Sequence, residues 1–418
     1  MHPIQSAQHS TDHRAVAESV TMRSHGEPGT RVLEAASLTV ATLFADPTRD
    51  DIALAVRQFL ASAGAALDLH ALPSSLARGG TVGRIGIPHD AAVIVEQQRA
   101  VIGASFGADP LAPVPRLWRG LQRRADVLID MRRSLTLPGS DAKRAGNERD
   151  VLLVSQRILE RTLRQARSDA PTADEWTRAR ESAEIVYRLA AAEQRTVMLV
   201  LPIGRGTGAQ QSFADALERQ ARVHRQPAPR IVKAGLLSAL LSGDSASARW
   251  LAASVMQMDE LSALATEAIG DTGPWPVVSV GRGATFYDMP MAASDAHDPV
   301  PLLLVIVHML QRCGRAAGAR ALMDSLLVTR TAEERMREEL GSQLPVPTDA
   351  FLRGVLANWG RTPSGAALVD RALTERALVD IARTPIGLIG EPLRNSSLDA
   401  WNADRPERRS RSRSALSA

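Results

Sequence analysis

The chain offers few side chains for proton transfer or nucleophilic attack. Its 418 residues include two lysines, Lys143 and Lys233, two tyrosines, Tyr187 and Tyr287, and one cysteine, Cys313. A mechanism that moves a proton through a lysine or a tyrosine is restricted to these positions. The single cysteine excludes a disulfide scaffold, a cysteine-based zinc site and an iron–sulfur cluster held by several cysteines. The sequence places no base beside Cys313, so we interpret it as a small helix residue.

A glycine-rich segment, Gly-Arg-Gly-Thr-Gly, follows an apolar run and precedes a predicted helix. Backbone amides at the start of a helix bind phosphate, and Gly204, Gly206 and Gly208 would allow a close approach. The segment lacks the lysine of a Walker motif and a regular Gly-x-Gly-x-x-Gly pattern. Two interpretations are open: a weak anion or cofactor site, or a flexible turn between strand and helix, which those absences favour.

Acidic and histidine side chains cluster at residues 295–298. Asp295, His297 and Asp298 could form a metal site, because carboxylates and imidazoles are common metal ligands. A solvated polar loop is the favoured interpretation. His308 lies within an apolar run, and we interpret it as a core or interface histidine and not as a ligand.

The composition predicts a folded body without net charge. Hydrophobic residues make up 44% of the chain and aromatic residues only 3%, so aliphatic side chains must form the core. The formal net charge is +4, and residues 405–418, with five arginines and one glutamate, account for all of it. Nucleic acid is therefore not an expected partner, although an RNA-binding arginine–serine tail is an alternative.

The ends of the chain and its hydropathy predict the cellular setting. No apolar run reaches 18 residues, and the first 20 residues are polar with mixed charge. We therefore expect no transmembrane helix, no signal peptide, no membrane partner and a cytoplasmic location. Residues 1–19 and 396–418 are expected to be a disordered leader and a disordered Arg/Ser tail.

Predicted strands and helices alternate along the chain, which is typical of an α/β protein with a wound sheet. After a turn at Gly29, the spacing of Val32, Val40 and Leu43 predicts a helix, and a second helix is expected at residues 50–67, followed by turns as far as Pro88. The remaining predictions are strands at 99–107, 147–158 and 195–204, a helix–strand unit at 115–139, a strand–helix unit at 249–270, a strand and loop at 274–290, and helices from about Asp90, from Thr172, at 212–224, at 231–243 and, as a packed pair, at 299–328.

Taken in order, several of these segments resemble the isocitrate and isopropylmalate dehydrogenases, which are metal-dependent decarboxylating β-hydroxyacid dehydrogenases. His25–Val32 resembles the family's Gly-Asp-Gly-Ile-Gly-Pro-Glu-Val start. Arg99–Pro110 is similar to its Ala-Asp-Ala-Val-Leu-Leu-Gly-Ala-Val-Gly-Gly-Pro strand. Leu121–Arg133 is similar to its Leu-Arg-Lys-x-Leu-Asp-Leu-Tyr-Ala-Asn-x-Arg-Pro segment, and Asp150–Ile158 to its Asp-Leu-x-Ile-Val-Arg-Glu-Asn-Thr strand. The helix that follows Asp298 resembles its Asn-Pro helix, so the resemblance spans about residues 20–395.

The resemblance implies an α/β, isopropylmalate dehydrogenase-like fold: a wound mixed sheet in a discontinuous large domain, with a smaller dimerisation domain. We expect residues 20–115 and 275–395 to form the large domain and residues 116–274 the small one. The apolar segments Leu236–Leu241 and Leu261–Ile269 fit a buried interface between two subunits.

The resemblance also shows which catalytic groups the chain lacks. Family members clamp the substrate carboxylates with arginines. Two of those positions hold Gln122 and Ser155 here, and only Arg132 is retained. The acid–base tyrosine position falls near residues 161–163, where there is no tyrosine, and the lysine position is Pro202, which cannot transfer a proton. After a register slip, Arg123 and Arg124 could substitute for the arginine lost at position 122.

The metal and cofactor positions are changed in the same way. The three carboxylates that hold Mg²⁺ or Mn²⁺ in the family correspond to Lys233, Asp259 and Ala263, a set that should bind no divalent cation. The cofactor loop lacks the family's His-Gly-Ser-Ala-Pro-Asp motif, and Asp298 replaces its asparagine. In a dimer, the ammonium of Lys233 could fill the place of the lost cation and pair with Asp259.

These joint losses predict a catalytically degenerate homologue with a regulatory, scaffolding or ligand-sensing role and no cofactor. The expected partner is a second copy of the chain or an intact paralogue of the family. One alternative is an active NAD- or NADP-dependent hydroxy-acid dehydrogenase that uses Mg²⁺ and an unusual substrate. Another is a nucleotide- or anion-binding module that uses residues 204–208.

Overall fold

The computed structural model describes residues 38–43, 58–59, 61–62, 67–71, 100–103, 113–134, 150–158, 172–202, 208–242, 249–269, 275–288, 299–312, 315–340 and 346–363. All of them belong to one structural unit, Ser37–Ala418. The expected leader, the Arg/Ser tail and the helix predicted near Asp90 lie outside the described residues.

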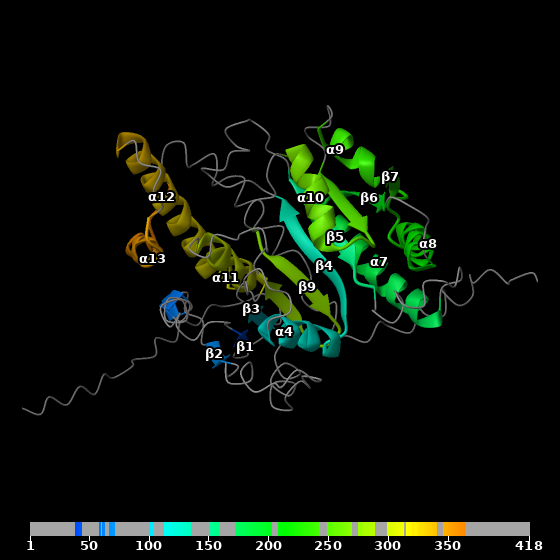
Figure 1. Cartoon of the computed structure of the whole chain (residues 1–418), viewed down its shortest axis with the longest axis horizontal. Helices are drawn as coiled ribbons and strands as arrows, with labels where there is room; N and C mark the ends of the chain where they lie inside the picture. Colours follow the sequence, from blue (N-terminus) through cyan, green and yellow to red (C-terminus); the bar gives the residue numbers. More distant parts are fainter. Residues whose placement is uncertain are drawn as a thin grey trace, which may run out of the picture. The chain divides into compact units, whose positions relative to one another are not determined.

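One sheet runs through the described part of the chain and contains ten strands (Figure 1). Their order across the sheet is β2 (Leu67–Ala71), β1 (Leu38–Leu43), β3 (Ala100–Gly103), β10 (Thr285–Asp288), β9 (Val277–Gly281), β4 (Val127–Ser134), β5 (Val151–Gln156), β8 (Trp250–Ser254), β6 (Thr196–Leu201) and β7 (Arg230–Lys233).

The strand directions make this a wound mixed sheet, which confirms the fold class predicted from the sequence. Strands β2, β1, β3 and β10 are mutually parallel, and so are β5, β8, β6 and β7. Between the two groups, β9 and β4 each pair antiparallel with both neighbours. The direction of the sheet therefore reverses at its centre, where Arg132 and Ser155 lie.

The register of the three central strands brings polar residues into one row. Asp130 on β4 lies opposite Ser155 on β5 and opposite Ser279 on β9. Residues opposite one another in a ladder project from the same face of the sheet, and side chains alternate between faces along a strand. Arg132, two residues after Asp130, therefore belongs to this same face.

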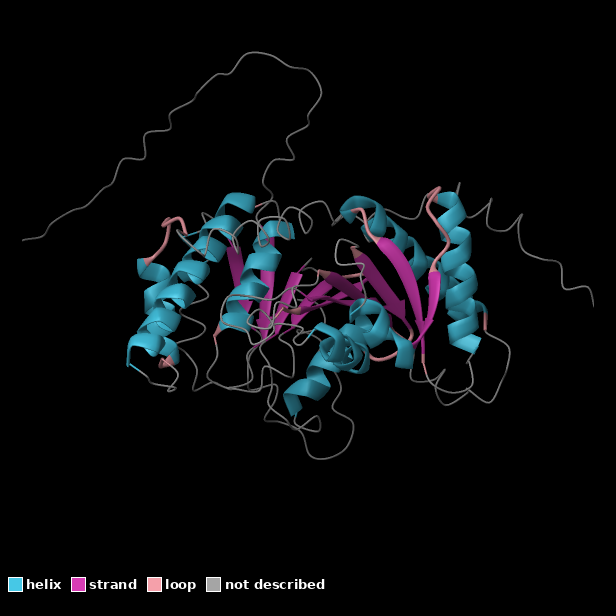
Figure 2. Cartoon of the chain, turned by 90° about the horizontal axis from the view of Figure 1, so that it is seen from above, coloured by secondary structure: helices cyan, strands magenta, loops and turns pink. Residues whose placement is uncertain are grey.

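Helices cover both faces of the sheet (Figure 2). On one face, Leu152 and Val154 of β5 belong to a core cluster with side chains of five helices. These helices are α7 (Ala173–Glu193), α8 (Gly208–Val223), α11 (Val300–Arg312), α12 (Ala316–Leu340) and α13 (Thr348–Ala357). Every residue of α11 is buried, so this helix is the central element of that cluster.

The opposite face has its own core. Val151 and Leu153, the alternate residues of β5, pack there with α9 (Ala234–Ser242) and α10 (Met258–Ile269). The helix α4 (Pro113–Arg124) contacts β4, and the ring of its Trp118 meets Phe286 of β10 edge-on at 5.3 Å. Because β5 is buried on both faces, its continuous apolar sequence is the pattern expected of an internal strand.

Local sequence signals define α7, the long helix predicted from Thr172. The Thr172 hydroxyl accepts from the backbone N–H of Glu175, and the Glu175 carboxylate accepts from the backbone N–H of Thr172, which is a complete capping box. The helix ends at Gln194, whose φ of 52° places it in the left-handed region. Capping at both ends fixes Glu193 beside the start of β6.

The structure corrects several predicted elements. Residues 38–43 form β1, although the spacing of Val40 and Leu43 predicted a helix. Residues 67–71 form β2 where turns were expected, and 230–233 form β7 where a helix was predicted. The loop expected after β9 contains β10. Short apolar segments have no decisive periodicity, and pairing with neighbouring strands determines their conformation.

The predicted domain boundaries stay a prediction. Strands β2, β1, β3, β10 and β9 come from the two segments assigned to the large domain, and the other five come from residues 116–274. The sheet is continuous across β9 and β4, where these two segments meet.

Candidate functional site

Three of the positions derived from the family resemblance lie close together in the structure. Gln122 near the end of α4, Arg132 on β4 and Ser155 on β5 are 3%, 5% and 2% exposed. They belong to the sheet face that α10 covers, because α10 contacts both β4 and β5. The Ser155 hydroxyl donates to the carbonyl of Met256, just before α10 begins. We call this region the α4–α10 face.

A closed ring of hydrogen bonds occupies the α4–α10 face. The Nε2 of Gln122 donates to the Ser279 hydroxyl at 3.3 Å, and that hydroxyl donates to Oδ1 of Asp130 at 2.6 Å. The Arg157 guanidinium donates to both carboxylate oxygens of Asp130, at 2.9 and 3.0 Å. A third Arg157 nitrogen donates to Oε1 of Gln122 at 2.8 Å and closes the ring.

The ring leaves its four members little capacity for a ligand. The Asp130 side chain is 10% exposed and the Arg157 side chain 34% exposed, so the ion pair lies at the edge of the buried region. The fork of Arg157 matches a carboxylate in two-pronged geometry, which is the geometry that a substrate carboxylate would need. Here Asp130 supplies that carboxylate from within the chain. Both ends of the Gln122 amide are also used, so position 122 does not act as a cationic clamp.

The positions expected to hold the proton-transfer and metal groups lie elsewhere. Pro202 follows the last residue of β6 and is half-buried. Lys233 ends β7, and Asp259 and Ala263 lie on α10; all three side chains are exposed. Among the residues that the structure describes, no three His, Cys, Asp or Glu side chains are grouped as metal ligands would be. The arrangement within one chain therefore offers no assembled cation site in the described regions.

Several predicted site residues fall outside the described residues: Gly204, Gly206, Asp295, His297, Asp298, Cys313 and Lys143. Gly208 is described and opens α8. Both tyrosines are buried. The Tyr187 hydroxyl donates to the carbonyl of Pro227 at 3.2 Å, and burial together with the charge of Glu218 raises the pKa of this phenol well above its ordinary value. Tyr187 is therefore a core residue and not a proton-transfer group.

A buried ionic cluster, which the sequence did not predict, joins the ends of several elements. Its members are Arg133, Asp150, Glu193, Arg195 and Arg249. Arg195 donates to both oxygens of Asp150, at 2.7 and 2.9 Å, and its Nε lies 2.6 Å from Glu193. Arg133 lies 3.1 Å from Asp150 and 2.7 Å from Glu193.

The charges of this cluster determine the ionisation of its two carboxylates. Burial alone would raise the pKa of Asp150 and of Glu193, but the neighbouring charges of Arg133 and Arg195 outweigh it and hold both pKa values below their ordinary range. Both carboxylates are therefore ionised at neutral pH. The cluster then contains three cations and two anions. Sequence alone does not show which of these charged residues meet.

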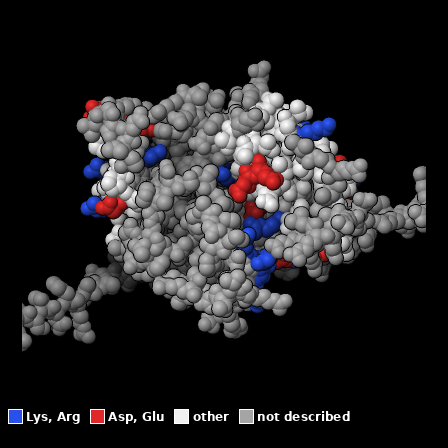
Figure 3. All heavy atoms as spheres, viewed as in Figure 1, with Lys and Arg blue, Asp and Glu red and all other residues white. Residues whose placement is uncertain are grey.

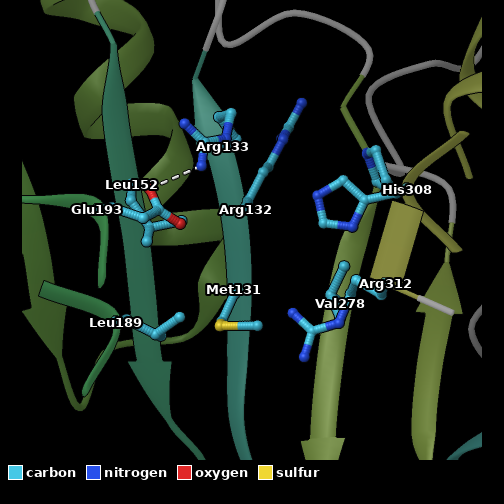
Figure 4. Close-up of a pocket in the computed structure, with 10 residues that line it drawn as sticks. Met131, Arg132, Arg133, Leu152, Leu189, Glu193, Val278, His308 and Arg312 are labelled. Atoms are coloured by element: carbon cyan, nitrogen blue, oxygen red, sulfur yellow. Dashed lines mark hydrogen bonds and ion pairs between the residues drawn. The ribbon is translucent and has the colours of Figure 1, made fainter. Parts of the chain in front are cut away.

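A small pocket lies beside the ionic cluster, on the sheet face opposite the α4–α10 face (Figure 4). Met131 and Val278 line it from β4 and β9, and both also belong to the core that contains α11. His308 and Arg312 of α11 face them, and Arg132, Arg133 and Glu193 complete its polar lining. The pocket is small and suits one or two waters or one small group.

Comparison with solved structures places the fold among known proteins. The TT0538 protein from Thermus thermophilus superposes with a TM-score of 0.57 at 15% sequence identity, over 79% of this chain and 70% of that chain. Isocitrate dehydrogenase from Methylococcus capsulatus superposes with a TM-score of 0.57 at 13% identity, over 77% of this chain and 98% of that chain. The chain therefore has an isocitrate dehydrogenase-like fold, and identity this low establishes the fold alone.

No family model and no curated protein matches the sequence. In the described residues, none of the helices has both the length and the apolar character that crossing a bilayer requires.

Proposed function

We propose that this protein is a catalytically degenerate member of the isocitrate and isopropylmalate dehydrogenase fold, with a regulatory, scaffolding or ligand-sensing role. The observation that carries the proposal is the closed ring of Gln122, Ser279, Asp130 and Arg157. A dehydrogenase of this type needs uncompensated cations where the substrate carboxylates bind. On the α4–α10 face, Gln122 and Ser155 occupy clamp positions and hydrogen-bond within the chain instead.

The proton-transfer and metal positions support the same conclusion. Pro202 has no ionisable group, so it cannot accept the proton that leaves the substrate hydroxyl. Lys233 places an ammonium where a hard divalent cation would need an oxygen ligand. Each loss alone would lower the rate by orders of magnitude, and the losses affect binding and chemistry together.

A role without catalysis implies a partner or a ligand. We propose a homodimer, or a heteromer with an intact paralogue, formed through α9 and α10. Ile231 and Leu236, which flank Lys233, are both 59% exposed, an unusual degree for large apolar side chains near a sheet edge. Acidic side chains gather over α10, whose first turn carries Asp259 and Glu260, and basic side chains lie near them (Figure 3).

Arg132 favours one alternative function. It retains the family arginine, is buried and belongs to the α4–α10 face, so one cation of the family's clamp is kept on the face where a substrate carboxylate would bind. An active NAD- or NADP-dependent hydroxy-acid dehydrogenase would use this arginine with a divalent cation and a substrate that carries fewer carboxylates. That enzyme would need a proton acceptor other than Pro202.

Thermal unfolding in the presence of candidate ligands distinguishes the two functions. The full chain is heated with isocitrate, isopropylmalate, tartrate or malate, each with NAD or NADP and with Mg²⁺, Mn²⁺ or EDTA. A ligand that binds only the folded state raises the unfolding temperature by mass action. We expect no rise that depends on the divalent cation. A cation-dependent rise with one hydroxy acid, lost in Arg132→Gln but kept in the control Arg353→Gln, would favour the dehydrogenase.

A further inference from the structure

Two polar side chains interrupt the buried, largely apolar helix α11 where it meets the sheet. His308 and Arg312 are separated by one helical turn, so they project from the same side of the helix. They are 8% and 5% exposed and face Met131 and Val278 across the pocket (Figure 4). Apolar residues at both positions would make so deeply buried a helix more stable, so the presence of two polar side chains needs an explanation.

Arg312 is a buried cation that has no counterion within the described part of the chain. Among the residues that the structure describes, none forms an ion pair with Arg312, and its Nε has no hydrogen-bond partner. Glu193 is the one carboxylate among the described residues that line the pocket, and it already contacts Arg133 at 2.7 Å and Arg195 at 2.6 Å. A buried charge without a counterion destabilises the folded state, so an anion in the pocket would stabilise the folded chain.

His308 adds a neutral hydrogen-bonding group to the same pocket. Its Nδ1 has no hydrogen-bond partner among the described residues, and the rings of Trp275 and Tyr287 lie 6.5 and 6.3 Å from the imidazole. Burial first, and then the positive charges of Arg312 and Arg133, lower the pKa of His308 well below its ordinary value. The neutral imidazole can donate one hydrogen bond without adding a second charge that would need compensation.

We propose that this pocket binds a small monoanion, the carboxylate group of a short organic acid, with Arg312 as its charge partner and His308 as a hydrogen-bond donor. The pocket is small and partly lined by Met131, Leu152 and Val278, so it suits a group of formate size better than a nucleotide or a phosphate ester. Arg312 and His308 lie on the opposite face from Asp130 and Ser279, and Arg132 is the one lining residue that also belongs to the α4–α10 face. The proposed anion site does not depend on the proposed loss of dehydrogenase activity.

The test is thermal unfolding of the full chain with sodium formate against sodium chloride at constant ionic strength. We expect the unfolding temperature to rise with the logarithm of formate concentration, with a dissociation constant on the order of 1 mM, a value that suits a ligand of three heavy atoms. Inorganic phosphate should give no rise beyond that of chloride. Equal effects of formate, phosphate and chloride would mean a general salt effect and would overturn the proposal.

Variants assign the effect to the pocket. Arg312→Gln should remove the formate-dependent rise, and His308→Gln should weaken formate binding about tenfold, which corresponds to one lost hydrogen bond. The matched control is Arg353→Gln, since Arg353 is an arginine with a side chain 75% exposed, and it should respond as the unaltered chain does. A formate response that persists in a folded Arg312→Gln chain would contradict the assignment.

Nuclear magnetic resonance of ¹³C-formate keeps the proposal testable if Arg312→Gln does not fold. The unaltered chain should broaden the formate line in a saturable way, and excess acetate should reverse the broadening by competition. No saturable broadening at formate concentrations up to about 100 mM, far above the affinity expected of a three-atom ligand, would overturn the proposal.

Discussion

The guanidinium of Arg157 grips the carboxylate of Asp130 in a two-pronged ion pair, at 2.9 and 3.0 Å. Under the proposed function, this pair lies on the sheet face where an active dehydrogenase of the same fold would bind the carboxylates of its substrate. An internal carboxylate thus occupies an arginine fork that a ligand would otherwise fill. We propose that this arrangement serves stability and not the binding of a substrate with several carboxylates.

The first prediction concerns this ion pair. Asp130→Asn should lower the free energy of unfolding by about 1–3 kcal/mol, because Arg157 and the Ser279 hydroxyl lose a charged acceptor. The figure is below that of a fully buried pair, since the Arg157 side chain is 34% exposed. Urea unfolding followed by circular dichroism measures it.

A double-mutant cycle separates this pair from the rest of the ring. Asp130→Asn, Arg157→Gln and the double variant should show a coupling energy of about 1–2 kcal/mol. Strictly additive effects of the two substitutions would mean that the ion pair adds nothing to stability.

The second prediction concerns the pH dependence of stability. Asp150 and Glu193 have lowered pKa values in the folded state, so the stability that they contribute is present above the ordinary carboxyl pKa of about 4 and is lost as the pH falls through the folded values. Asp150→Asn should cost about 2–3 kcal/mol at pH 7, because the buried Arg195 and Arg133 lose a partner, and the figure is below that of a fully buried pair since the Asp150 side chain is 23% exposed.

The same substitution should also flatten the decrease in stability between about pH 4 and pH 2, since the amide of the variant would take up no proton on unfolding. Urea unfolding at a series of pH values provides the measurement. The control is Asp349→Asn, in an exposed ion pair with Arg353, which should cost less than about 1 kcal/mol. An unchanged pH profile in Asp150→Asn would refute the assigned role of the ionic cluster.

The third prediction tests the start of α7. Thr172→Ala removes the hydroxyl that accepts from the Glu175 backbone and should cost about 1 kcal/mol. Thr177→Ala in the same helix is the matched control. Within the described part of the chain its hydroxyl bonds only to the carbonyl of Ala173, so alanine there should be neutral or stabilising by about 0.5 kcal/mol. Equal effects of the two substitutions on the unfolding midpoint would argue against the capping box.

The fourth prediction concerns association through α9 and α10. In a dimer, the ammonium of Lys233 should pair with Asp259 of the other copy. Lys233→Met or Asp259→Asn alone should then weaken the dimer by roughly 1–4 kcal/mol if the pair is partly buried, and the double variant by less than the sum. Sedimentation equilibrium measures the dissociation constants. A chain that stays monomeric at micromolar concentration would remove both the pair and the interface.

Much of the fold could be predicted from the sequence because the long elements carry strong local signals. The apolar run within residues 147–158 predicted β5, and the long helix expected from Thr172 is α7. The strands β1, β2, β7 and β10 were missed, since four to six residues do not by themselves distinguish a strand from one helical turn. β1 and β7 are strands because parallel neighbours pair with them, and that information is not local.

The sequence predicted which catalytic and metal-binding residues of the family are replaced at the candidate site. It could not predict the hydrogen bonds that the replacing residues make. The resemblance identified Gln122, Arg132 and Ser155, and the structure brings all three to one face. It gave no indication of Arg157 and Ser279, because their roles depend on the register of β4 with β5 and β9. The pocket at Arg312 depends on how α11 packs against β4 and β9, which no sequence spacing specifies.

Steady-state turnover tests the central claim most directly. The full chain is assayed at pH 7.5 for reduction of NAD and NADP with isocitrate, isopropylmalate, tartrate or malate, each with Mg²⁺ and with Mn²⁺. Without the arginine clamp and the tyrosine–lysine pair, several orders of magnitude in rate are missing, so we predict no turnover above the buffer rate. Turnover near one per second, of the order of ordinary enzymes, that disappears in Arg132→Gln and persists in Arg353→Gln would contradict the account.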